Sequence, residues 1–391
     1  MSYRILTLNQ LSAYGLSRFP RASYEIGTDV ERPDAILVRS ADLQAASIAP
    51  TVRCIGRAGA GVNNIQVDVM SQRGIPVFNT PGANANAVKE LVLAGLLLAA
   101  RNVAPAWLFA RGLKGDDASI HEAVEKGKKR FVGFELPGRT LGVVGLGAVG
   151  VEVANSAIAL GMKVLGYDPQ ITVRRAWQLS AQVEQAPSLD EVFTRSDAVT
   201  VHVPLSSDTR RLVNAARLKL MRRSGAILNF ARAAIVDEEA VIAALDAGRL
   251  HAYVCDFPSN ALKEHPKVVA LPHLGACTGE AEENCAVMVV NQVRDFLENG
   301  NIRNSVNYPE AILPRVPNTT RLAIANRNVP NMVGQISSCL AAARLNIADL
   351  LNKSRGEYAY TLIDVDGALG EELLSQIVSI EGVLAARLII G

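Results

Sequence analysis

The chain has 391 residues, which is long enough for two or three domains. Its 40 basic and 38 acidic side chains nearly cancel, and the formal charge of +2 excludes a broad electrostatic attraction to nucleic acid or to a membrane surface. Hydrophobic residues make up 49% of the chain and aromatic residues only 5%, a composition that suits parallel sheets covered by helices.

Other features narrow the class of protein further. The longest apolar stretches, such as residues 91–100, are too short to cross a bilayer, and the start at Met1 is expected to be a strand and not a signal peptide. The five cysteines are scattered and form no CxxC pair, and the five histidines lack a metal-binding spacing. We therefore expect a cytoplasmic protein without a metal site.

The first quarter of the chain alternates short apolar runs with amphipathic segments, a pattern typical of a parallel α/β sheet. The predicted strands are residues 3–8, 34–39, 53–57 and 76–79, and the amphipathic segments are 43–48 and 65–73. A glycine-rich turn at residues 58–64 follows the third strand. Because no dinucleotide-binding motif opens this region, we expect it to bind something other than a dinucleotide.

A long helix is predicted for residues 85–102, where apolar positions recur at helical spacing. It would carry the chain from one domain to the next. Residues 112–137 are polar and basic, and they are expected to form a solvated helix face with a loop.

Residues 141–150 read as a buried strand, a tight glycine turn and the first turn of a helix. Gly145, Gly147 and Gly150 fit the G-x-G-x-x-G pattern that lets a backbone approach a pyrophosphate at a helix N-terminus. A second predicted strand ends in Asp168, where an acid would hold the adenosine ribose hydroxyls. The same carboxylate would repel a 2′-phosphate, so the pattern favours NAD over NADP.

Later strands continue this sheet, and three polar side chains follow their ends. The strands are predicted at residues 197–203, 226–230, 252–255 and 268–271, with helices at 237–247 and 279–299. Arg232, Asp256 and His273 come directly after three of these strands, at the edge where such sheets bind ligands. An arginine can grip a carboxylate and a histidine can pass a proton, which are the needs of hydride transfer to or from a 2-hydroxy acid.

The C-terminal region of the chain changes character. Residues 300–318 are rich in asparagine and proline and are predicted to be a linker. After them the order strand, helix, strand, strand, helix, strand is predicted. The six elements are expected at residues 321–326, 332–343, 347–352, 358–365, 371–380 and 383–390.

These motifs together resemble the D-isomer-specific 2-hydroxyacid dehydrogenase family. The matching pieces are Gly-Arg-Ala-Gly-Ala-Gly-Val-Asn-Asn at 56–64, Asn-Thr-Pro at 79–81, the glycine motif at 145–150, Tyr-Asp-Pro at 167–169, His-Val-Pro at 202–204, the stretch 229–237 around Arg232, and Pro-His-Leu-Gly-Ala-Cys-Thr at 272–278. The final 70 or so residues resemble an ACT domain. Family members of this build oxidise 3-phosphoglycerate to 3-phosphohydroxypyruvate with NAD, the first step of serine synthesis.

The resemblance implies a fold class and domain boundaries. We expect two doubly wound parallel-sheet domains, one a Rossmann NAD-binding domain and one a flavodoxin-like substrate-binding domain, with a small C-terminal βαββαβ ACT-like domain. The implied boundaries are 1–98 with 279–306 for the substrate domain, 99–278 for the NAD domain, 307–318 for the linker and 319–391 for the ACT-like domain.

The resemblance also implies site residues. Arg232 would bind the substrate carboxylate, His273 would be the acid and base, and backbone N–H groups of Gly61 and Val62 would assist. Arg39 and Arg57 would bind the substrate phosphate. The expected contacts to NAD are Gly145, Gly147, Ala148, Val149, Gly150, Asp168, His202, Val203, Pro204, Phe230, Ala231, Arg232, Asp256, His273 and Gly275.

Three departures from the family pattern bear on the chemistry. Asn260 stands where the family has a glutamate that pairs with the histidine. Its neutral amide can orient an imidazole but cannot stabilise the cation as a carboxylate does, so either Glu264 reaches back or Lys263, if buried, is itself the proton donor. Ala233 replaces a glycine after the arginine, and Asn331 replaces a glycine in the C-terminal unit.

Partners follow from the same resemblance. Asn326, Asn328 and Asn346 are candidates for binding L-serine as an effector, and a homodimer or homotetramer is expected. Two alternatives stay open. One is another 2-hydroxyacid dehydrogenase acting on glyoxylate or hydroxypyruvate, and the other is a non-catalytic, NAD-sensing binding protein of the same fold.

Overall fold

The computed structural model describes residues 2–43 and 48–389, which fall into two compact units. Residues 1–83 and 282–391 belong to the first unit, and residues 84–281 form the second. The domain boundaries expected from the sequence stay a prediction. The C-terminal segment groups with the first unit.

The first unit contains a five-stranded parallel sheet in the order β2-β1-β3-β4-β5, the flavodoxin-like order. Its strands are β1 (Tyr3–Thr7), β2 (Tyr24–Gly27), β3 (Ala35–Val38), β4 (Cys54–Arg57) and β5 (Val77–Phe78). The four predicted strands are confirmed. The edge strand β2 is not predicted, because its four residues alternate only weakly between apolar and polar.

Helices α1 (Ala13–Leu16), α2 (Val67–Gln72) and α11 (Gly279–Asn299) accompany this sheet. The segment of α11 inside the unit packs directly on β4: a Cβ built on Gly56 would lie 2.6 Å from Val289 and 2.8 Å from Leu37. The amphipathic segment predicted for residues 43–48 falls mostly on residues 44–47, which lie outside the described residues. Helix α2 covers six of the nine residues expected for 65–73.

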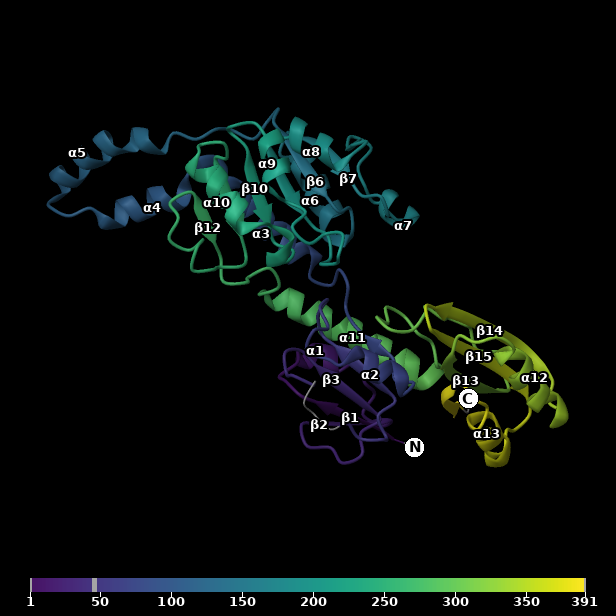
Figure 1. Cartoon of the computed structure of the whole chain (residues 1–391). Helices are drawn as coiled ribbons and strands as arrows, with labels where there is room; N and C mark the ends of the chain where they lie inside the picture. The colour runs from purple at the N-terminus through teal and green to yellow at the C-terminus, as the bar shows by residue number, and fades with distance from the viewer. Residues whose placement is uncertain (1, 44–47, 390–391) are drawn as a thin grey trace. The chain divides into compact units, whose positions relative to one another are not determined.

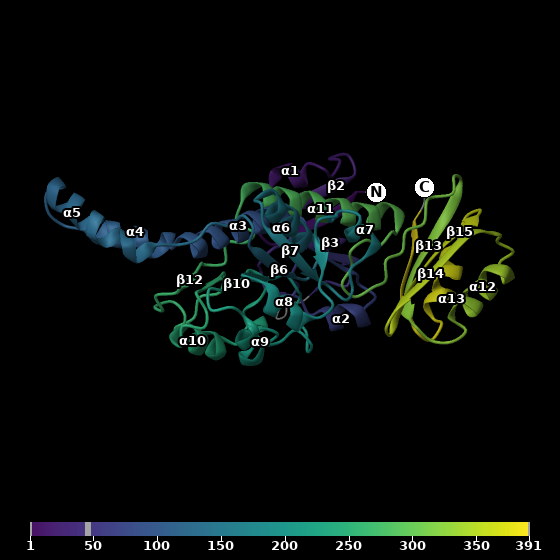
Figure 2. The same ribbon diagram turned by 90° about the horizontal axis from the view of Figure 1, so that it is seen from above.

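The C-terminal region is a four-stranded antiparallel sheet in the order β14-β15-β13-β16. Its strands are β13 (Thr319–Arg327), β14 (Ile347–Arg355), β15 (Tyr358–Asp366) and β16 (Val383–Ile389). Helices α12 (Met332–Ala342) and α13 (Glu371–Val378) cover one face, as Figure 2 shows. The predicted order of six elements is confirmed.

The other face of this sheet packs into the core of the first unit. Tyr360 and Leu362 are buried together with Phe296 and Leu297 of α11. The segment 300–318 connects the two sheets and is partly buried: Tyr308 is fully buried, and Asn307 accepts a hydrogen bond from the N–H of Val77 at 2.8 Å. Asn301, which accepts from the N–H of Leu313 at 3.1 Å, and Asn307 therefore satisfy buried backbone groups, while Asn304 is exposed.

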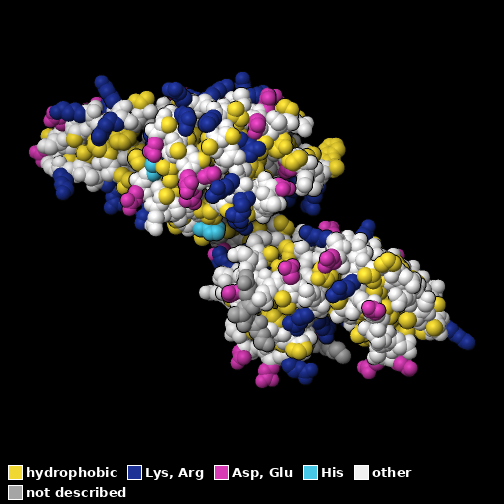
Figure 3. Space-filling view, viewed as in Figure 1, with side chains coloured by type: hydrophobic (Ala, Val, Ile, Leu, Met, Phe, Trp, Pro, Cys, Tyr) yellow, Lys and Arg dark blue, Asp and Glu magenta, His cyan; other side chains and the backbone are white. Residues whose placement is uncertain are grey.

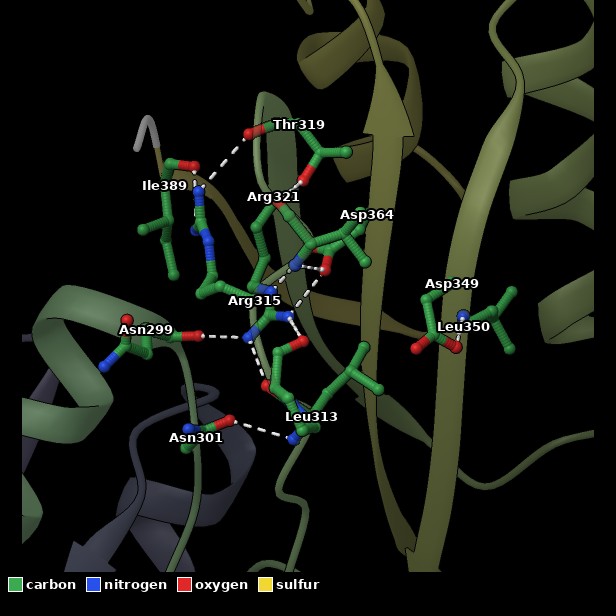
Figure 4. A network of polar contacts seen from close by, with 12 residues as sticks. Asn299, Asn301, Leu313, Arg315, Thr319, Arg321, Asp349, Leu350, Asp364 and Ile389 are labelled. Atoms are coloured by element: carbon green, nitrogen blue, oxygen red, sulfur yellow. Dashed lines mark hydrogen bonds and ion pairs between the residues drawn. The ribbon is translucent and has the colours of Figure 1, made fainter.

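A buried ion pair holds the C-terminal sheet in place (Figure 4). Arg321 on β13 and Asp364 on β15 are both fully buried and form a bidentate pair, with Nε–Oδ1 at 2.7 Å and Nη2–Oδ2 at 2.6 Å. The guanidinium also donates to the carbonyls of Asn299, Leu313 and Pro314. One side chain thus joins the sheet to the end of α11 and to the connecting segment.

The second unit is a seven-stranded parallel sheet in the order β12-β11-β10-β9-β6-β7-β8. Its strands are β6 (Thr140–Val144), β7 (Lys163–Tyr167), β8 (Glu184–Gln185), β9 (Ala198–Val201), β10 (Ala226–Asn229), β11 (Ala252–Cys255) and β12 (Val268–Ala270). Six strands are predicted and confirmed. The seventh, β8, has only two exposed polar residues, which carry no strand pattern.

Helices cover both faces of this sheet (Figure 1), as a doubly wound fold requires. Helices α3 (Ala85–Arg101) and α6 (Ala148–Ala159) contribute to one apolar core, and α8 (Leu189–Arg195), α9 (Ala215–Leu220) and α10 (Glu238–Asp246) to the other. Helix α10 starts where predicted, because Asp237 accepts a hydrogen bond from the N–H of Ala240.

Two helices extend away from this sheet. Helix α4 (Val103–Gly112) and helix α5 (Asp117–Gly127), with the short helix η1 (Lys128–Phe131), form the projecting arm in Figure 1. In the described residues of the chain, no single helix is long and apolar enough to cross a membrane. The pair α3 and α4 passes that test by length and composition, but it bends by 66° at the break between its helices.

The Arg321 network yields a stability prediction. Replacing Arg321 by Met leaves the Asp364 carboxylate buried without its partner, and we expect the free energy of unfolding to fall by about 3–5 kcal/mol. Arg303→Met is the matched control, because Arg303 is half-exposed in its pair with Asp295 and should change stability by less than about 1 kcal/mol. Denaturant unfolding followed by circular dichroism measures both; equal losses would contradict the assigned role of Arg321.

Candidate active site

The glycine motif forms the turn that the sequence predicts, at the carboxyl end of β6. Gly145 has φ +90°, and a Cβ there would lie 2.8 Å from the carbonyl oxygen of His202. A Cβ on Gly150 would lie 1.9 Å from the carbonyl oxygen of Gly145. These two positions therefore require glycine, while the Cβ position of Gly147 faces open space next to the start of α6.

This turn fits a dinucleotide. The backbone N–H groups at Gly147, Ala148 and Val149 begin α6, where a pyrophosphate would be held by free N–H groups and the helix dipole. Asp168 follows β7 and lies against the turn, since its carboxylate accepts hydrogen bonds from the N–H of Leu146 and Gln170, both at 2.8 Å. The half-buried carboxylate keeps further lone pairs for ribose hydroxyls.

His202 follows β9 and lines the same turn. Its Nε2 lies 2.9 Å from Oγ1 of Thr200, and burial lowers the pKa of its imidazole to about 4. The ring is therefore neutral at physiological pH. Val203 lies beside Gly145 and Pro204 is exposed, so the three residues form a largely uncharged wall next to the glycine turn.

Arg232, Asp256 and His273 lie at the same edge of the sheet, as predicted. They follow β10, β11 and β12, which are neighbouring parallel strands. Arg232 is exposed, and its Nη1 donates to the carbonyl of Ala231 at 2.6 Å. Ala233 starts the short helix η2 (Ala233–Ile235) without a left-handed φ, so alanine is compatible with the place where the family has glycine.

Two buried polar side chains brace these loops. Asn229 is fully buried, donates to the carbonyl of Arg232 at 2.9 Å and accepts from the N–H of Ala231 at 3.2 Å. Asp256 is 1% exposed and accepts from the N–H groups of Leu274 at 2.7 Å and Gly275 at 2.8 Å. The sequence indicated Asp256 only as a cofactor contact, and it gave Asn229 no role.

His273 has an unusual backbone and no carboxylate partner among the described residues. Its φ is +57°, in the left-handed region, and its exposed ring lies 5.3 Å from the ring of Phe257. Asn260, Lys263 and Glu264 are exposed, and their side chains form no hydrogen bond with any described residue. The expectation of a buried lysine at 263 is wrong, because its ammonium group is not desolvated.

The first unit brings Arg39 and Arg57 to one edge of its sheet. Arg39 directly follows β3 and Arg57 is the last residue of the neighbouring β4, where Val38 pairs with Arg57. Arg39 forms an ion pair with Glu282 at 2.7 Å, and the guanidinium of Arg57 lies where a Cβ on Gly59 would be. Glu282 is a neighbour that the sequence did not indicate, since α11 brings it to this edge.

The glycine turn of residues 58–64 adjoins these arginines. Asn79 donates to the carbonyl of Ala60 at 2.6 Å, and the N–H of Thr80 donates to the carbonyl of Gly59 at 3.1 Å. Gly61 and Val62 are half-buried in this braced turn. The Asn-Thr-Pro motif therefore supports the backbone that would offer N–H groups to a ligand.

The C-terminal sheet contains a small cavity of about 160 Å³ beside the start of α12. Asn326 and Asn328 line it together, while Asn346 lies at the opposite end of β14, where it donates to Asp366 at 2.7 Å. Asn331 adopts φ +62° in the turn before α12, a conformation that asparagine tolerates in place of glycine.

A parallel sheet with a nucleotide turn, followed by an arginine and a histidine at its ligand edge, defines the nucleotide-binding unit of a dehydrogenase. Among the described residues, no three His, Cys, Asp or Glu side chains cluster as metal ligands would. Residues 103–275 match the sequence profile of the D-isomer specific 2-hydroxyacid dehydrogenase NAD binding domain.

Relatives with known names agree with this class. The chain is 32% identical over 352 residues to D-3-phosphoglycerate dehydrogenase of Haemophilus influenzae, covering 87% of this chain and 82% of that one. It is 36% identical over 295 residues to the Archaeoglobus fulgidus enzyme of the same name, covering 73% of this chain but only 53% of the relative. The chain thus belongs to the D-isomer specific 2-hydroxyacid dehydrogenase family.

A solved structure shows the same fold. The NAD+-bound 3-phosphoglycerate dehydrogenase of Entamoeba histolytica aligns with a TM-score of 0.61 and 26% identity, over 78% of this chain and 99% of that one. Several relatives, such as the archaeal one, are about twice the length that this chain spans. The similarity therefore establishes the family of this chain, and its substrate has to be inferred from the site residues.

Proposed function

We propose that this chain oxidises 3-phosphoglycerate to 3-phosphohydroxypyruvate with NAD. The observation that carries the choice of substrate is the position of Arg39 and Arg57 at the ends of two adjacent strands, where Val38 pairs with Arg57. A phosphate needs fixed cations, and guanidinium groups bind it through paired N–H donors. Glu282 holds Arg39 in place and would exchange its contact for the phosphate.

The second unit supplies the groups for oxidation. Arg232 would hold the substrate carboxylate through two parallel hydrogen bonds, so that C2 is fixed in position. His273 would accept the proton of the C2 hydroxyl. Bound NAD supplies the two-electron acceptor for this oxidation. Because Asn260 offers no negative charge, the histidine cation would be stabilised by solvent at the exposed ring and not by a carboxylate.

The alternatives lack such support. A reductase for glyoxylate or hydroxypyruvate handles no phosphate and has no use for Arg39 and Arg57. A non-catalytic NAD-sensing protein needs neither the arginine nor the histidine at the ligand edge. The cytoplasm remains the compartment that we expect, and the free cysteines fit it.

We also propose L-serine as an effector, bound in the C-terminal cavity. Asn326 is 1% exposed at the floor, next to Thr361 and Asn352, whose amide donates to Thr361 at 2.7 Å. The cavity is smaller than the roughly 300 Å³ of drug-sized sites, so it suits a small polar molecule. Pairing of the edge strand β14 with a second copy would bring the partner subunit's Asn346 toward this end of the sheet.

We further propose that two copies associate through the arm. Trp107 and Leu108 on α4 are 55% and 63% exposed, and none of the residues of α4 is buried. Figure 3 shows apolar side chains lying among basic ones over this arm. Exposed apolar surface of this kind marks a protein–protein contact.

The phosphate assignment is tested with Arg57→Met. Loss of charge-assisted hydrogen bonds should lower kcat/KM for 3-phosphoglycerate by about 10- to 100-fold, while the value for glycerate stays within about twofold. Arg53→Met is the control, because Arg53 precedes the same strand and pairs with Asp34 at its other end. Equal losses with both substrates would mean that Arg57 only supports the glycine turn.

The effector assignment is tested with Asn326→Ala. Saturating L-serine should lower the initial rate and raise the melting temperature of the wild type, and the variant should lose both responses because the cavity floor no longer pairs with the ligand. L-Alanine, which lacks the hydroxyl, is the matched ligand control. Unchanged rate and melting temperature of the wild type with L-serine would sink the assignment.

The association surface is tested with Trp107→Glu. A carboxylate in a buried apolar contact is costly, so sedimentation equilibrium should show monomers at concentrations where the wild type forms dimers or tetramers. Trp177→Glu is the control, since Trp177 is 85% exposed next to α7 (Val173–Ala176), away from the arm. A variant that stays as large as the wild type would rule out the arm as the main contact.

A further inference from the structure

We propose that Asn229 and Asp256 are positioning residues, with Asn229 fixing Arg232 and Asp256 fixing His273. The inference rests on the proposed function, since it assigns both side chains to the same oxidation. Neither side chain needs to touch the substrate for this role. Each lies buried at a strand end and holds the backbone of the loop that carries the chemical group.

Asp256 ties the His273 loop to the neighbouring strand. Its carboxylate is 1% exposed and accepts from the two consecutive N–H groups that follow His273, at 2.7 and 2.8 Å. A buried carboxylate needs such charge-assisted bonds, and these are short and roughly twice as strong as neutral ones. These two hydrogen bonds, the Asp256 clamp, therefore tie the loop after His273 to the end of β11.

His273 is fixed from both sides. On its N-terminal side the N–H of Leu271 donates to the carbonyl of Cys255 at 2.8 Å, and on its C-terminal side the clamp begins with Leu274. Between these anchors His273 adopts φ +57°, a conformation that costs a residue with a Cβ about 1–2 kcal/mol. Such strain persists only where the surroundings over-determine it, and Asp256 supplies that constraint.

Close packing leaves the clamp little freedom. Gly275 is buried, and a Cβ there would lie 3.2 Å from Oδ2 of Asp256. The ring of Phe257, the residue after Asp256, lies 5.3 Å from the ring of His273. Asp256 thus holds the backbone that carries the imidazole and Phe257 lies beside its ring, in a chain whose Asn260 offers no carboxylate.

Asn229 has the corresponding role on the adjacent strand. Its amide uses a donor on the carbonyl of Arg232 and its acceptor on the N–H of Ala231, so both ends face the arginine loop. The two positioning residues are themselves joined, because the N–H of Asp256 donates to the carbonyl of Asn229 at 3.2 Å. The positions of Arg232 and His273 are therefore both set by the neighbouring strands β10 and β11.

The test compares Asp256→Asn with Asp197→Asn. Asp197 is also a buried aspartate that accepts from a backbone N–H, that of Thr140 at 2.8 Å, but it lies at the opposite edge of the sheet. Asp256→Asn places an amide N–H group against a backbone N–H group, so one hydrogen bond is lost and the loop shifts. A displacement of about 1 Å at a catalytic group costs about 100-fold in rate. We expect kcat to fall by about that factor.

Asp197→Asn should lower the melting temperature with kcat unchanged. Asn229→Asp removes the donor to Arg232 and should raise KM for the hydroxy acid more than it lowers kcat, since the arginine binds the carboxylate. Amide hydrogen exchange gives a readout without turnover: the Leu274 and Gly275 amides should be protected in the wild type and exchange faster in Asp256→Asn.

Two outcomes overturn the proposal: an unchanged kcat in Asp256→Asn, or an equal kinetic loss in Asp197→Asn. Failure of the proposed function is distinguishable, because it would appear as a wild type inactive on 3-phosphoglycerate. In that case unprotected Leu274 and Gly275 amides in the wild type would still contradict the clamp, and protected amides would still support it.

Discussion

Parallel strands end at the same edge of a sheet, and the chemistry of residues 84–281 depends on that constraint. The glycine turn, Asp168, Arg232 and His273 come from loops far apart in the sequence, yet each follows a strand of one sheet. The nucleotide turn lies after β6, next to the point where the strand order reverses between β6 and β9. The sheet of the first unit has the same arrangement, with Arg39 and Arg57 at the ends of β3 and β4.

Much of this arrangement can be predicted from the sequence, because steric limits on the backbone require particular residue types at particular positions. Gly145 and Gly150 must be glycines because a Cβ at either position would collide with a carbonyl oxygen, and this requirement is visible in the sequence as a glycine motif. Long apolar strands and the helix of residues 85–101 carry strong periodic patterns. Very short edge strands, such as β2 and β8, do not, because pairing with a neighbour and not side-chain pattern makes them strands.

The supporting contacts around the candidate site could not be predicted from the sequence, because they depend on tertiary structure. Nothing local marks Asn229 as the support of Arg232, or Glu282 as the partner of Arg39, since each contact joins a loop to a buried or distant group. The asparagine-rich segment 300–318 reads as a linker, but the amides of Asn301 and Asn307 accept hydrogen bonds from buried backbone groups. Lys263 is a candidate proton donor in the sequence, but its side chain is exposed. Arg321 likewise shows no sign in the sequence that it is fully buried.

The phosphate group of the substrate is decisive for the proposed activity, because Arg39 and Arg57 lie at the ends of two adjacent strands, where two guanidinium groups suit a phosphate. The most direct measurement is therefore the initial rate of NADH formation by the wild type with 3-phosphoglycerate, D-glycerate and D-lactate under the same conditions. We predict a kcat/KM for 3-phosphoglycerate well above those for the two unphosphorylated acids. No NADH from 3-phosphoglycerate, or an equal or higher value with glycerate, would contradict the proposed activity.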